Sequence, residues 1–433
     1  MSLSILPSQS CALKEQSLAF ATLDPKASRL LPTLKDIDGS ILKTQIWGPI
    51  SLPIGLNPQL KQLHLKECNV TPAMLAIIRK TFFSLTTVQI TNDRLDEKTL
   101  IELTSIKRLE LTYCRISSKA LSQFSKFYCL KKLILISNSF ENCQLTSLLG
   151  LKLLTNLKAD SCRINGIGIK IIAQLTGLKT LSLADNGLND HRITALAHLK
   201  NLTDLDLSHN CDIVGEGLVA LTSLRLERLE LVHCPVINGK AFEAMTDLTF
   251  LNLFTSFSQV AYFSGLTNLT DLTHPADLDG EDLQGLSLMT NLVSLDLEDA
   301  FLKLDHASQL NHFSALINLN TLLLKDIQFQ GEPGSPSNLE ESLVLTRALA
   351  KLKQLNVLSL TLGSFNQEIA QNLDKLTLLS SFTLILKDMN VDGGITRLCS
   401  ECLNLTSLQL KNCTLKGRAQ HYLQELGSFN ACK

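Results

Sequence analysis

The sequence predicts an α/β solenoid, in which similar units stack and each adds one short strand to a parallel sheet and one helical segment to the opposite side. Three observations support this fold class. A frame of leucines recurs with a fixed period, the apolar spacing inside each copy changes from strand-like to helix-like, and one position of the frame is cysteine or asparagine. A single unit of this kind cannot bury both of its apolar faces, so neighbouring units must stack.

The frame is clearest between Leu178 and Asp247. The chain reads LKTLSLADNGLNDHRITALAHLKN, then LTDLDLSHNCDIVGEGLVALTSLR, then LERLELVHCPVINGKAFEAMTD, and the first leucines are 24 residues apart (202 − 178, and 226 − 202). Each copy begins L-x-x-L-x-L-x-x-(N/C), which is the leucine-rich repeat pattern. We therefore expect a leucine-rich repeat solenoid (horseshoe), with a parallel β-sheet on the concave face and helices on the convex face.

The strand and the helix of each copy follow from its apolar spacing. The L-x-L core alternates with period two, as in a half-buried strand. The run that follows, for example Ile193, Leu196 and Leu199, has helical spacing. About fifteen units begin at Leu60, Leu85, Ile106, Leu130, Leu154, Leu178, Leu202, Leu226, Leu248, Leu269, Leu292, Leu319, Leu355, Leu379 and Leu405. Those at Leu154, Leu269 and Leu379 fit least well.

Helix starts carry capping residues. Thr71 followed by Pro72 is typical of an N-cap and first helical residue. The same slot in later units is occupied by other good N-cap residues, namely Asp96, Ser117, Asn165, Asn189 and Asn238. The agreement of caps with the repeat period strengthens the prediction of fold.

The predicted domain organisation is a segment 1–59 followed by a solenoid from 60 to 433. Residues 1–59 contain the only tryptophan, Trp47, do not fit the frame, and are interpreted as a leader and N-terminal capping segment. A separate small binding module is the alternative. Within the solenoid we expect irregular units near 253–283, an insertion near 328–350 that opens with the loop-forming QGEPGSPS and continues as a helix from about Leu339 to Leu352, and a C-terminal cap near 415–433.

Composition and charge narrow the function classes. The 40 basic and 41 acidic side chains give a net charge of −1, which argues against a general nucleic-acid binder. The chain lacks the basic start and apolar core of a secretory signal and any run long enough to span a membrane, so we expect a soluble protein. We also expect it to be a monomer. Several of the 12 cysteines share one frame position with asparagine (Cys68, Cys114, Cys162, Cys234 and Cys413, against Asn138, Asn186 and Asn210), which indicates buried thiols in a reducing compartment.

The candidate binding surface is the column of side chains between the paired leucines of each strand. The column reads His64, Gln89, Glu110, Ile134, Lys158, Ser182, Asp206, Glu230, Asn252, Thr273, Asp296, Leu323, Ser359, Thr383 and Gln409. It is too polar for a core and matches the face with which repeat proteins bind partners. Acidic side chains gather at its middle: Asp160, Asp185, Asp204, Asp206 and Glu230, then Asp271, Asp296, Glu298 and Asp299.

Within that face we single out partner-binding residues. Phe250 and Phe254 lie between the two acidic groups, and an aromatic anchor beside ordered charge is typical of interface hot spots. The predicted set on the concave face is Asp185, Asp204, Asp206, His209, Glu230, His233, Phe250, Phe254, Asp296 and Glu298. The competing interpretation is that the acidic side chains only keep an open sheet soluble. His209 and His233 occupy equivalent positions and should be neighbours, either as ordinary surface histidines or as a pH-sensitive or metal-binding pair.

The sequence favours a protein without catalysis, cofactor or metal. It has no Gly-rich phosphate loop, no G-x-S-x-G, and no nucleophile with an evident base. Cys399 and Cys402 have CxxC spacing with Cys413 and His421 downstream, but Cys413 occupies the frame position and the others fall on a predicted helix, so zinc is not predicted. Near the C-terminal end, Val357, Leu362, Ile385 and Leu386 occupy positions expected to face solvent. They are either covered by the segment Leu339 to Leu352 or form a second apolar contact surface.

The repeats LTGLKTLSLADNGL, LKNLTDLDLSHNCDIVGEGLVAL and LTNLTDL resemble those of bacterial leucine-rich repeat effector-type proteins, such as the plant-pathogen GALA proteins and the repeat proteins of Legionella and amoeba-associated chlamydiae. The resemblance covers about residues 60–426. It implies a non-catalytic protein that is delivered from the bacterial cytoplasm into the host cytosol, where it binds a host protein with a basic or mixed surface. Many relatives recruit a ubiquitin ligase through an F-box. The alternative is therefore an adaptor that docks a ligase through residues 1–59, although this segment lacks a recognisable F-box.

Overall fold

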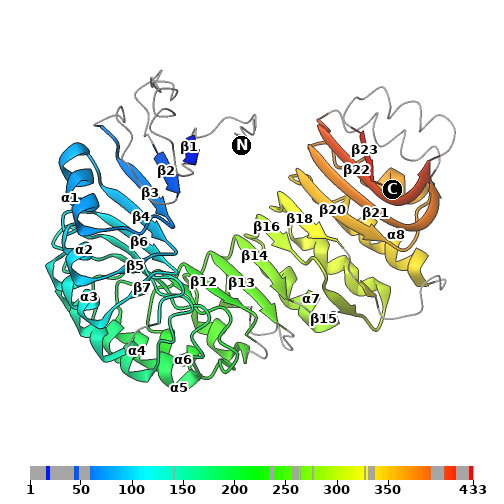
Figure 1. Ribbon diagram of the computed structural model, residues 1–433. Coiled ribbons are helices and arrows are strands. Elements are labelled where there is room, and N and C mark those ends of the chain that lie inside the picture. The colour runs from blue at the N-terminus through cyan, green and yellow to red at the C-terminus, as the bar shows by residue number, and fades with distance from the viewer. Residues whose placement is uncertain are drawn as a thin grey trace, which may run out of the picture. The chain divides into compact units, whose positions relative to one another are not determined.

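The computed structural model describes residues 16–19, 43–47, 59–139, 142–234, 238–255, 263, 265–275, 277–325, 328–329, 337–391, 404–415 and 429–432. The chain divides into two compact units, residues 1–186 and residues 187–433. Each unit has its own run of parallel strands with helical segments on the other side of the sheet (Figure 1).

In residues 1–186 the sheet is parallel throughout and its strands follow chain order. Neighbouring strands pair in register, for example Leu63 with Val88 and Val88 with Leu109. The strands are β1 (Gln16–Ala19), β2 (Lys43–Trp47), β3 (Gln62–Lys66), β4 (Thr87–Thr91), β6 (Arg108–Thr112), β8 (Lys132–Ile134), β9 (Asn156–Lys158) and β10 (Thr180–Ser182). A smaller parallel pair is formed by β5 (Arg94–Leu95) and β7 (Arg115–Ile116). The helical segments are α1 (Pro72–Thr81), α2 (Glu97–Ile101), α3 (Ser118–Ser122), η2 (Gln123–Lys126), η3 (Asn142–Gly150) and α4 (Gly166–Ile172).

In residues 187–433 the strands of the main sheet are also parallel. The sheet strands are β11 (Asp204–Asp206), β12 (Arg228–Val232), β13 (Phe250–Thr255), β14 (Asp271–Pro275), β16 (Ser294–Asp296), β18 (Thr321–Leu324), β20 (Val357–Leu362), β21 (Ser381–Val391), β22 (Ser407–Leu415) and β23 (Phe429–Cys432). A second parallel sheet consists of β15 (Asp277–Asp279), β17 (Phe301–Lys303) and β19 (Gln328–Phe329). The helical segments are α5 (Asp190–Ile193), η4 (Thr194–His198), α6 (Leu218–Leu221), η5 (Gly239–Ala244), α7 (Gly280–Ser287), η7 (Ala307–Ala315), α8 (Ser337–Leu349) and α9 (Gln367–Leu373).

The predicted repeats are confirmed strand by strand. Each of the fifteen predicted units contributes a strand of the parallel sheet, including the three weakest, whose strands are β9, β14 and β21. The frame leucines form the core; Leu205 and Leu207, for example, are 1% and 0% exposed. All six predicted N-caps accept a hydrogen bond from the backbone of the first helical turn, as when Asp96 Oδ1 accepts from Thr99 N at 2.8 Å.

The cysteine and asparagine position is a buried hydrogen-bonding ladder. Asn138 Nδ2 donates to Leu111 O at 2.7 Å, and Cys114 Sγ donates to Ile90 O at 3.2 Å, so each side chain reaches a carbonyl of the preceding unit. Asparagine also accepts, as Asn186 Oδ1 does from Ile164 N at 2.9 Å. The position therefore joins successive units through polar groups that would otherwise be buried without partners.

Three segments differ from the sequence interpretation. Residues 16–19 and 43–47, within the segment set apart from the repeats, form β1 and β2, which extend the sheet in parallel beyond β3. At the other end, β23 pairs in parallel with β22, so a strand follows the last unit. The remaining residues of 1–58 and of the proposed cap at 415–433 lie outside the described residues.

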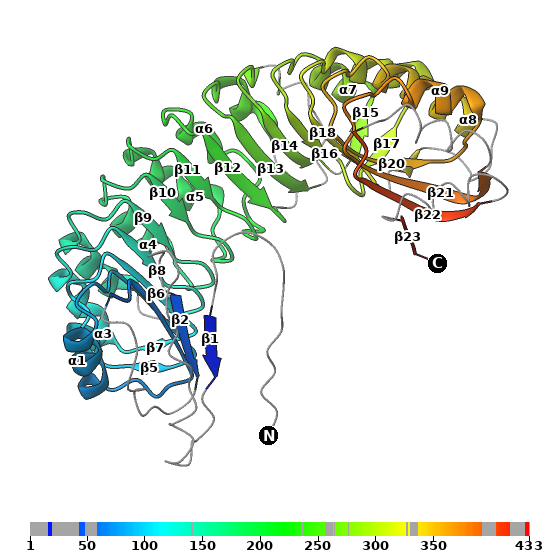
Figure 2. The same cartoon turned by 90° about the horizontal axis from the view of Figure 1, so that it is seen from above.

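The third segment is the expected insertion. Its helix is confirmed as α8, but α8 packs between η7 and α9 in the helix layer (Figure 2). It therefore does not cover the strand face. Ile385 is nonetheless only 5% exposed there. The expectation that Leu362 and Leu386 face solvent is wrong: both are 0% exposed because they follow the core residues Leu360 and Leu384 by two positions and share their side of the sheet. Residues 330–336 of the loop QGEPGSPS, and residues 256–262, 264 and 276 of the irregular stretch 253–283, fall outside the described residues. In the described part of the chain, no helix combines the length and apolar character needed to cross a membrane.

Candidate interaction surface

The predicted column of outward strand side chains lies on the strand face. Most of its members are half-buried, as polar side chains on an open sheet should be. Three small or apolar members are shaded by their neighbours: Ile134 is 8% exposed, and Ser182 and Ser359 are each 6% exposed.

Two adjacent rows of these positions make up the acidic part of residues 187–433. One row runs across neighbouring strands as Asp206, Glu230, Asn252, Thr273 and Asp296. The other runs as Asp204, Arg228, Phe250, Asp271 and Ser294. The register thus places Asp206 beside Glu230, and two strands, β13 and β14, lie between Glu230 and Asp296.

A basic residue that was not singled out from the sequence, Arg228, organises the centre of this surface. Its guanidinium forms an ion pair with Glu230, with Nη2 3.0 Å from Oε1, and Nε donates to the same oxygen at 3.1 Å. The guanidinium carbon also lies 3.4 Å from the centroid of the Phe250 ring, which is a cation–π contact. Residues i and i+2 of a strand lie on the same face, so the R-x-E spacing in the sequence could have predicted this ion pair. We call Arg228, Glu230 and Phe250 the Arg228 cluster.

The other acidic residues are also engaged with their surroundings. Asp204 Oδ2 accepts from Thr203 Oγ1 at 2.6 Å, and Asp206 Oδ1 accepts from Ser208 N at 3.0 Å. Asp296 Oδ1 accepts in the same way from Glu298 N at 3.0 Å. Glu298 lies 3.5 Å from Lys325 Nζ. Because Glu230 and Glu298 pair with Arg228 and Lys325, the surface is less negative than a count of its carboxylates predicts.

Four predicted binding residues lie in the turns that follow the strands rather than among the strand side chains, namely Asp185, His209, His233 and Glu298. Asp185, His209 and His233 follow the strands with positive φ of 53°, 59° and 56°, because the frame places a left-handed residue at this point. They are exposed at the carboxyl ends of the strands, which corrects their placement in the column. The predicted proximity of the two histidines is confirmed, with ring centroids 4.7 Å apart. The side chain of Phe254, on β13, lies outside the described residues.

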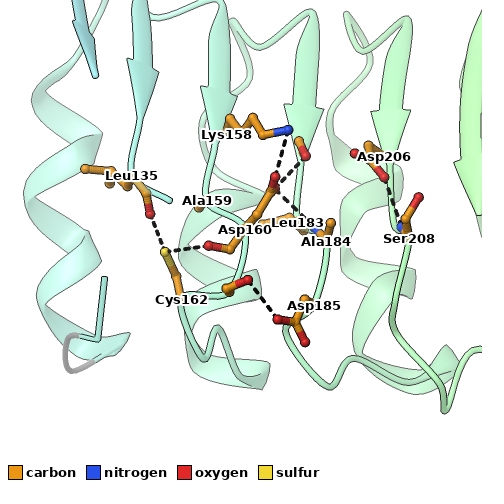
Figure 3. Close-up of polar contacts among 12 residues, drawn as sticks. Leu135, Lys158, Ala159, Asp160, Cys162, Leu183, Ala184, Asp185, Asp206 and Ser208 are labelled. Atoms are coloured by element: carbon orange, nitrogen blue, oxygen red, sulfur yellow. Dashed lines mark hydrogen bonds and ion pairs between the residues drawn. The ribbon is translucent and has the colours of Figure 1, made fainter. Parts of the chain in front are cut away.

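Asp160 is a structural carboxylate, in contrast to its assignment to the acidic surface. It is 9% exposed and accepts from Ser182 Oγ at 2.5 Å and from Ala184 N at 3.2 Å, while Lys158 Nζ lies 2.8 Å from its other oxygen (Figure 3). Figure 3 also shows Cys162 beside the carbonyls of Leu135 and Asp160. Asp160 thus ties β9 to the following unit of residues 1–186 and leaves little surface for a partner.

The frame cysteines are poor nucleophiles. Burial raises the pKa of the Cys114 and Cys162 thiols to about 12 and that of Cys234 to about 11. Since the thiolate is the reactive species, these residues are almost fully protonated near neutral pH.

Alkylation should therefore separate two classes of cysteine. With iodoacetamide at pH 8, we expect the exposed Cys143 and Cys211 to be labelled, while Cys68, Cys114, Cys162 and Cys234 react only after unfolding. Peptide mass mapping of native and urea-treated protein measures this. Labelling of Cys162 in the native protein at the rate of Cys143 would contradict the buried ladder.

Among the residues that the structure describes, no group of three or more histidine, cysteine or acidic side chains is arranged to hold a metal ion. Cys399, Cys402 and His421, and the side chain of Cys413, lie outside those residues. In the described surface, the geometry offers paired charges and an aromatic ring for recognition.

Comparison with known proteins identifies the fold. A family model described as Leucine Rich repeat matches residues 198–221. No curated protein sequence matches the chain. Among solved structures, the chain is similar to an internalin (inlF) from Listeria monocytogenes, with 21% identity and a TM-score of 0.51, covering 73% of this chain and 86% of that chain.

It is also similar to the mouse RP105/MD-1 complex, with 14% identity and a TM-score of 0.58, covering 90% of this chain and 74% of that chain. These likenesses agree with the parallel sheet and the helical layer of the two units. The chain therefore has the leucine-rich repeat fold.

Proposed function

We propose that this protein is a non-catalytic protein-interaction module that binds its partner on the strand face of residues 187–433. The observation that carries the proposal is the Arg228 cluster, in which a half-buried arginine is held between a carboxylate and an aromatic ring. Arginine and aromatic residues dominate binding energy at protein interfaces when their position is fixed before binding.

The charges around the cluster define the kind of partner. Asp204 and Asp206 on β11 and Asp271 on β14 lie on the strands that flank the cluster, and none of them is fully buried. Because Glu230 and Glu298 already pair with Arg228 and Lys325, the surface presents alternating rather than uniform charge. A partner with a basic or mixed surface complements it best. In the matched register opposite charges meet and attract, whereas in a shifted register like charges meet and repel.

We further propose that the partner is a host protein and that this chain is a bacterial effector acting in the host cytosol. The resemblance of its repeats to those of effector-type proteins supports this assignment. Buried frame cysteines that donate hydrogen bonds as thiols agree with a reducing compartment, where such thiols persist.

Charge reversal tests the surface directly. We expect the variant Asp206→Lys, Glu230→Lys, Asp296→Lys to lose capture of the partner from amoebal cytosol. The matched control reverses three exposed carboxylates in or beside helices of the same unit, Glu216, Glu243 and Asp305, and should retain capture. The single change Arg228→Ala should weaken the purified complex by about 2 kcal/mol, which is roughly 30-fold. Unchanged capture by the strand-face variant would contradict the proposed surface.

A further inference from the structure

The net charge of the whole chain is near zero because its two units carry opposite net charges that nearly cancel. Residues 60–186 contain 18 lysines and arginines against 9 aspartates and glutamates, whereas residues 187–433 contain 17 against 28. Charge asymmetry of this kind between halves of a chain points to a polyanionic partner for the basic half. The net charge of the whole chain argued against a nucleic-acid partner. That argument does not apply to residues 60–186, in which basic side chains outnumber acidic ones.

Four of these 18 basic side chains form a row at the amino end of the strands. Successive backbone N–H groups of Thr86, Lys107, Lys131, Thr155 and Lys179 donate to the carbonyls of Lys61, Thr86, Lys107, Lys131 and Thr155, at 2.8–3.0 Å. One residue from each of six neighbouring units thus forms a continuous row, and its four lysines are exposed. We call Lys61, Lys107, Lys131 and Lys179 the lysine row. Its length is about 24 Å at a strand spacing of about 4.8 Å.

A second basic row lies beside the first. Arg108 and Lys132, the residues after Lys107 and Lys131, are register partners on β6 and β8. Burial lowers the pKa of Lys132, and the positive charges of Arg108 and Lys158 lower it further, against the opposing effect of Glu110. The Lys132 ammonium is thus partly desolvated and lies near two other cations.

The carboxylates nearest these rows are already occupied. Glu110 pairs with Arg108 and accepts from Gln89, and Asp160 pairs with Lys158. Within the described part of residues 59–186, no ion pair involves Lys61, Lys107 or Lys131. The charges of Lys61, Lys107 and Lys131 are therefore available to a ligand.

Two aromatic rings are exposed at the same edge. Phe83 is 70% exposed and Tyr128 is 67% exposed. Each lies in the turn that leads into a strand, three residues before the row residues Thr86 and Lys131. Large aromatic side chains this exposed beside a row of lysines are the combination by which proteins hold single-stranded nucleic acid: cations track the phosphates and rings stack on bases.

We propose that the amino edge of the strands in residues 60–186 binds single-stranded nucleic acid through the lysine row and Lys132, with Phe83 and Tyr128 as stacking platforms. An acidic protein segment would use the same lysines but gains nothing specific from the rings. The row accommodates roughly seven stacked nucleotides at about 3.4 Å each. Contacts to bases through ring faces predict little dependence on sequence.

The salt dependence follows from the number of phosphates neutralised. About four contacts give a slope of about −2.8 in log K against log salt, so affinity should fall about 50-fold between 50 and 200 mM salt. The probe is a fluorescein-labelled 12-nucleotide poly-dT with the full chain, followed by fluorescence anisotropy.

Matched variants separate the lysine row from total charge. Lys107→Glu with Lys131→Glu should weaken binding by about 10- to 100-fold and reduce the slope to about −1.4. The control, Lys119→Glu with Lys170→Glu, makes the same change of net charge on α3 and α4 of the same unit, where both side chains are exposed. It should change affinity by less than about threefold, since exposed charges further away than about 10 Å are screened.

The aromatic platform has its own test. Tyr128→Ala should weaken poly-dT binding by roughly 5- to 150-fold and leave the salt slope unchanged, because stacking on a base is uncharged. Circular dichroism confirms that each variant remains folded. Three results would overturn the proposal. The first is no binding of poly-dT at 50 mM salt, and the second is an equal loss of affinity in the helix-side control. The third is a 12-residue poly-glutamate peptide that binds as tightly as poly-dT and whose affinity is unchanged by Tyr128→Ala.

Discussion

Replacing Asn186 with alanine is expected to lower the free energy of unfolding of residues 1–186 by about 3–5 kcal/mol. Asn186 Nδ2 donates to Ala159 O and Leu183 O, each at 2.9 Å, and Oδ1 accepts from Cys162 N and Ile164 N at 3.1 and 2.9 Å. All these groups are buried, so the variant leaves donors and acceptors without partners and without access to water. Urea denaturation followed by circular dichroism measures the loss.

The frame supplies an informative control for this substitution. In the preceding repeat the same frame position is occupied by Cys162, whose thiol donates a hydrogen bond. Asn186→Cys therefore keeps a donor, and the free energy of unfolding should fall by less, about 1–2 kcal/mol. An alanine variant as stable as the cysteine variant would show that the ladder does not join the units as argued.

Replacing Phe242 with alanine is expected to destabilise residues 187–433 by about 3–5 kcal/mol. The ring is 0% exposed and packs against Phe263, with centroids 5.6 Å apart and planes at 60°. Truncation opens a cavity beneath η5 and removes the aromatic contact, and the frame leucines on either side are too closely packed to fill the space. Thermal unfolding monitored by calorimetry would record the change.

The size of the cavity decides the effect, and Phe242→Leu provides the comparison. Leucine fills most of the volume, so the expected loss falls to about 1–1.5 kcal/mol. Equal losses for leucine and alanine would indicate that the aromatic pair, rather than the volume, stabilises this part of the chain. Losses below 1 kcal/mol for both would mean that the irregular stretch near Phe263 is not packed as a regular unit.

Much of the fold could be predicted because its determinants are local and repeated. The frame leucines, the N-cap residues and the Cys/Asn position recur at a fixed spacing, so an error in one unit is corrected by the next. The weakest units, at Leu154, Leu269 and Leu379, still form strands because pairing with neighbours on both sides completes their backbone hydrogen bonds. The two strands within residues 1–59 were missed because their sequences lack the leucine frame.

The candidate surface was predicted as a face but not as a set of contacts. The alternation of the strands fixes which side chains point outward, and this gave Asp206, Glu230 and Phe250. It does not tell which charges neutralise one another. Arg228 was overlooked although it binds Glu230 and covers Phe250, and Asp160 was counted as surface although Ser182 and Lys158 enclose it.

The sequence by itself determined the repeat, its strand and helix, and the face on which polar side chains stand, because these depend on residues close together in the chain. Only the tertiary structure decided how side chains of successive units meet. The contacts of Arg228 with Phe250 and of Asp160 with Ser182 join residues 22 positions apart, and their partners depend on the register between strands. Electrostatic attraction depends on the distance between charges in the fold, so the order of charged residues along the chain does not tell which of them pair.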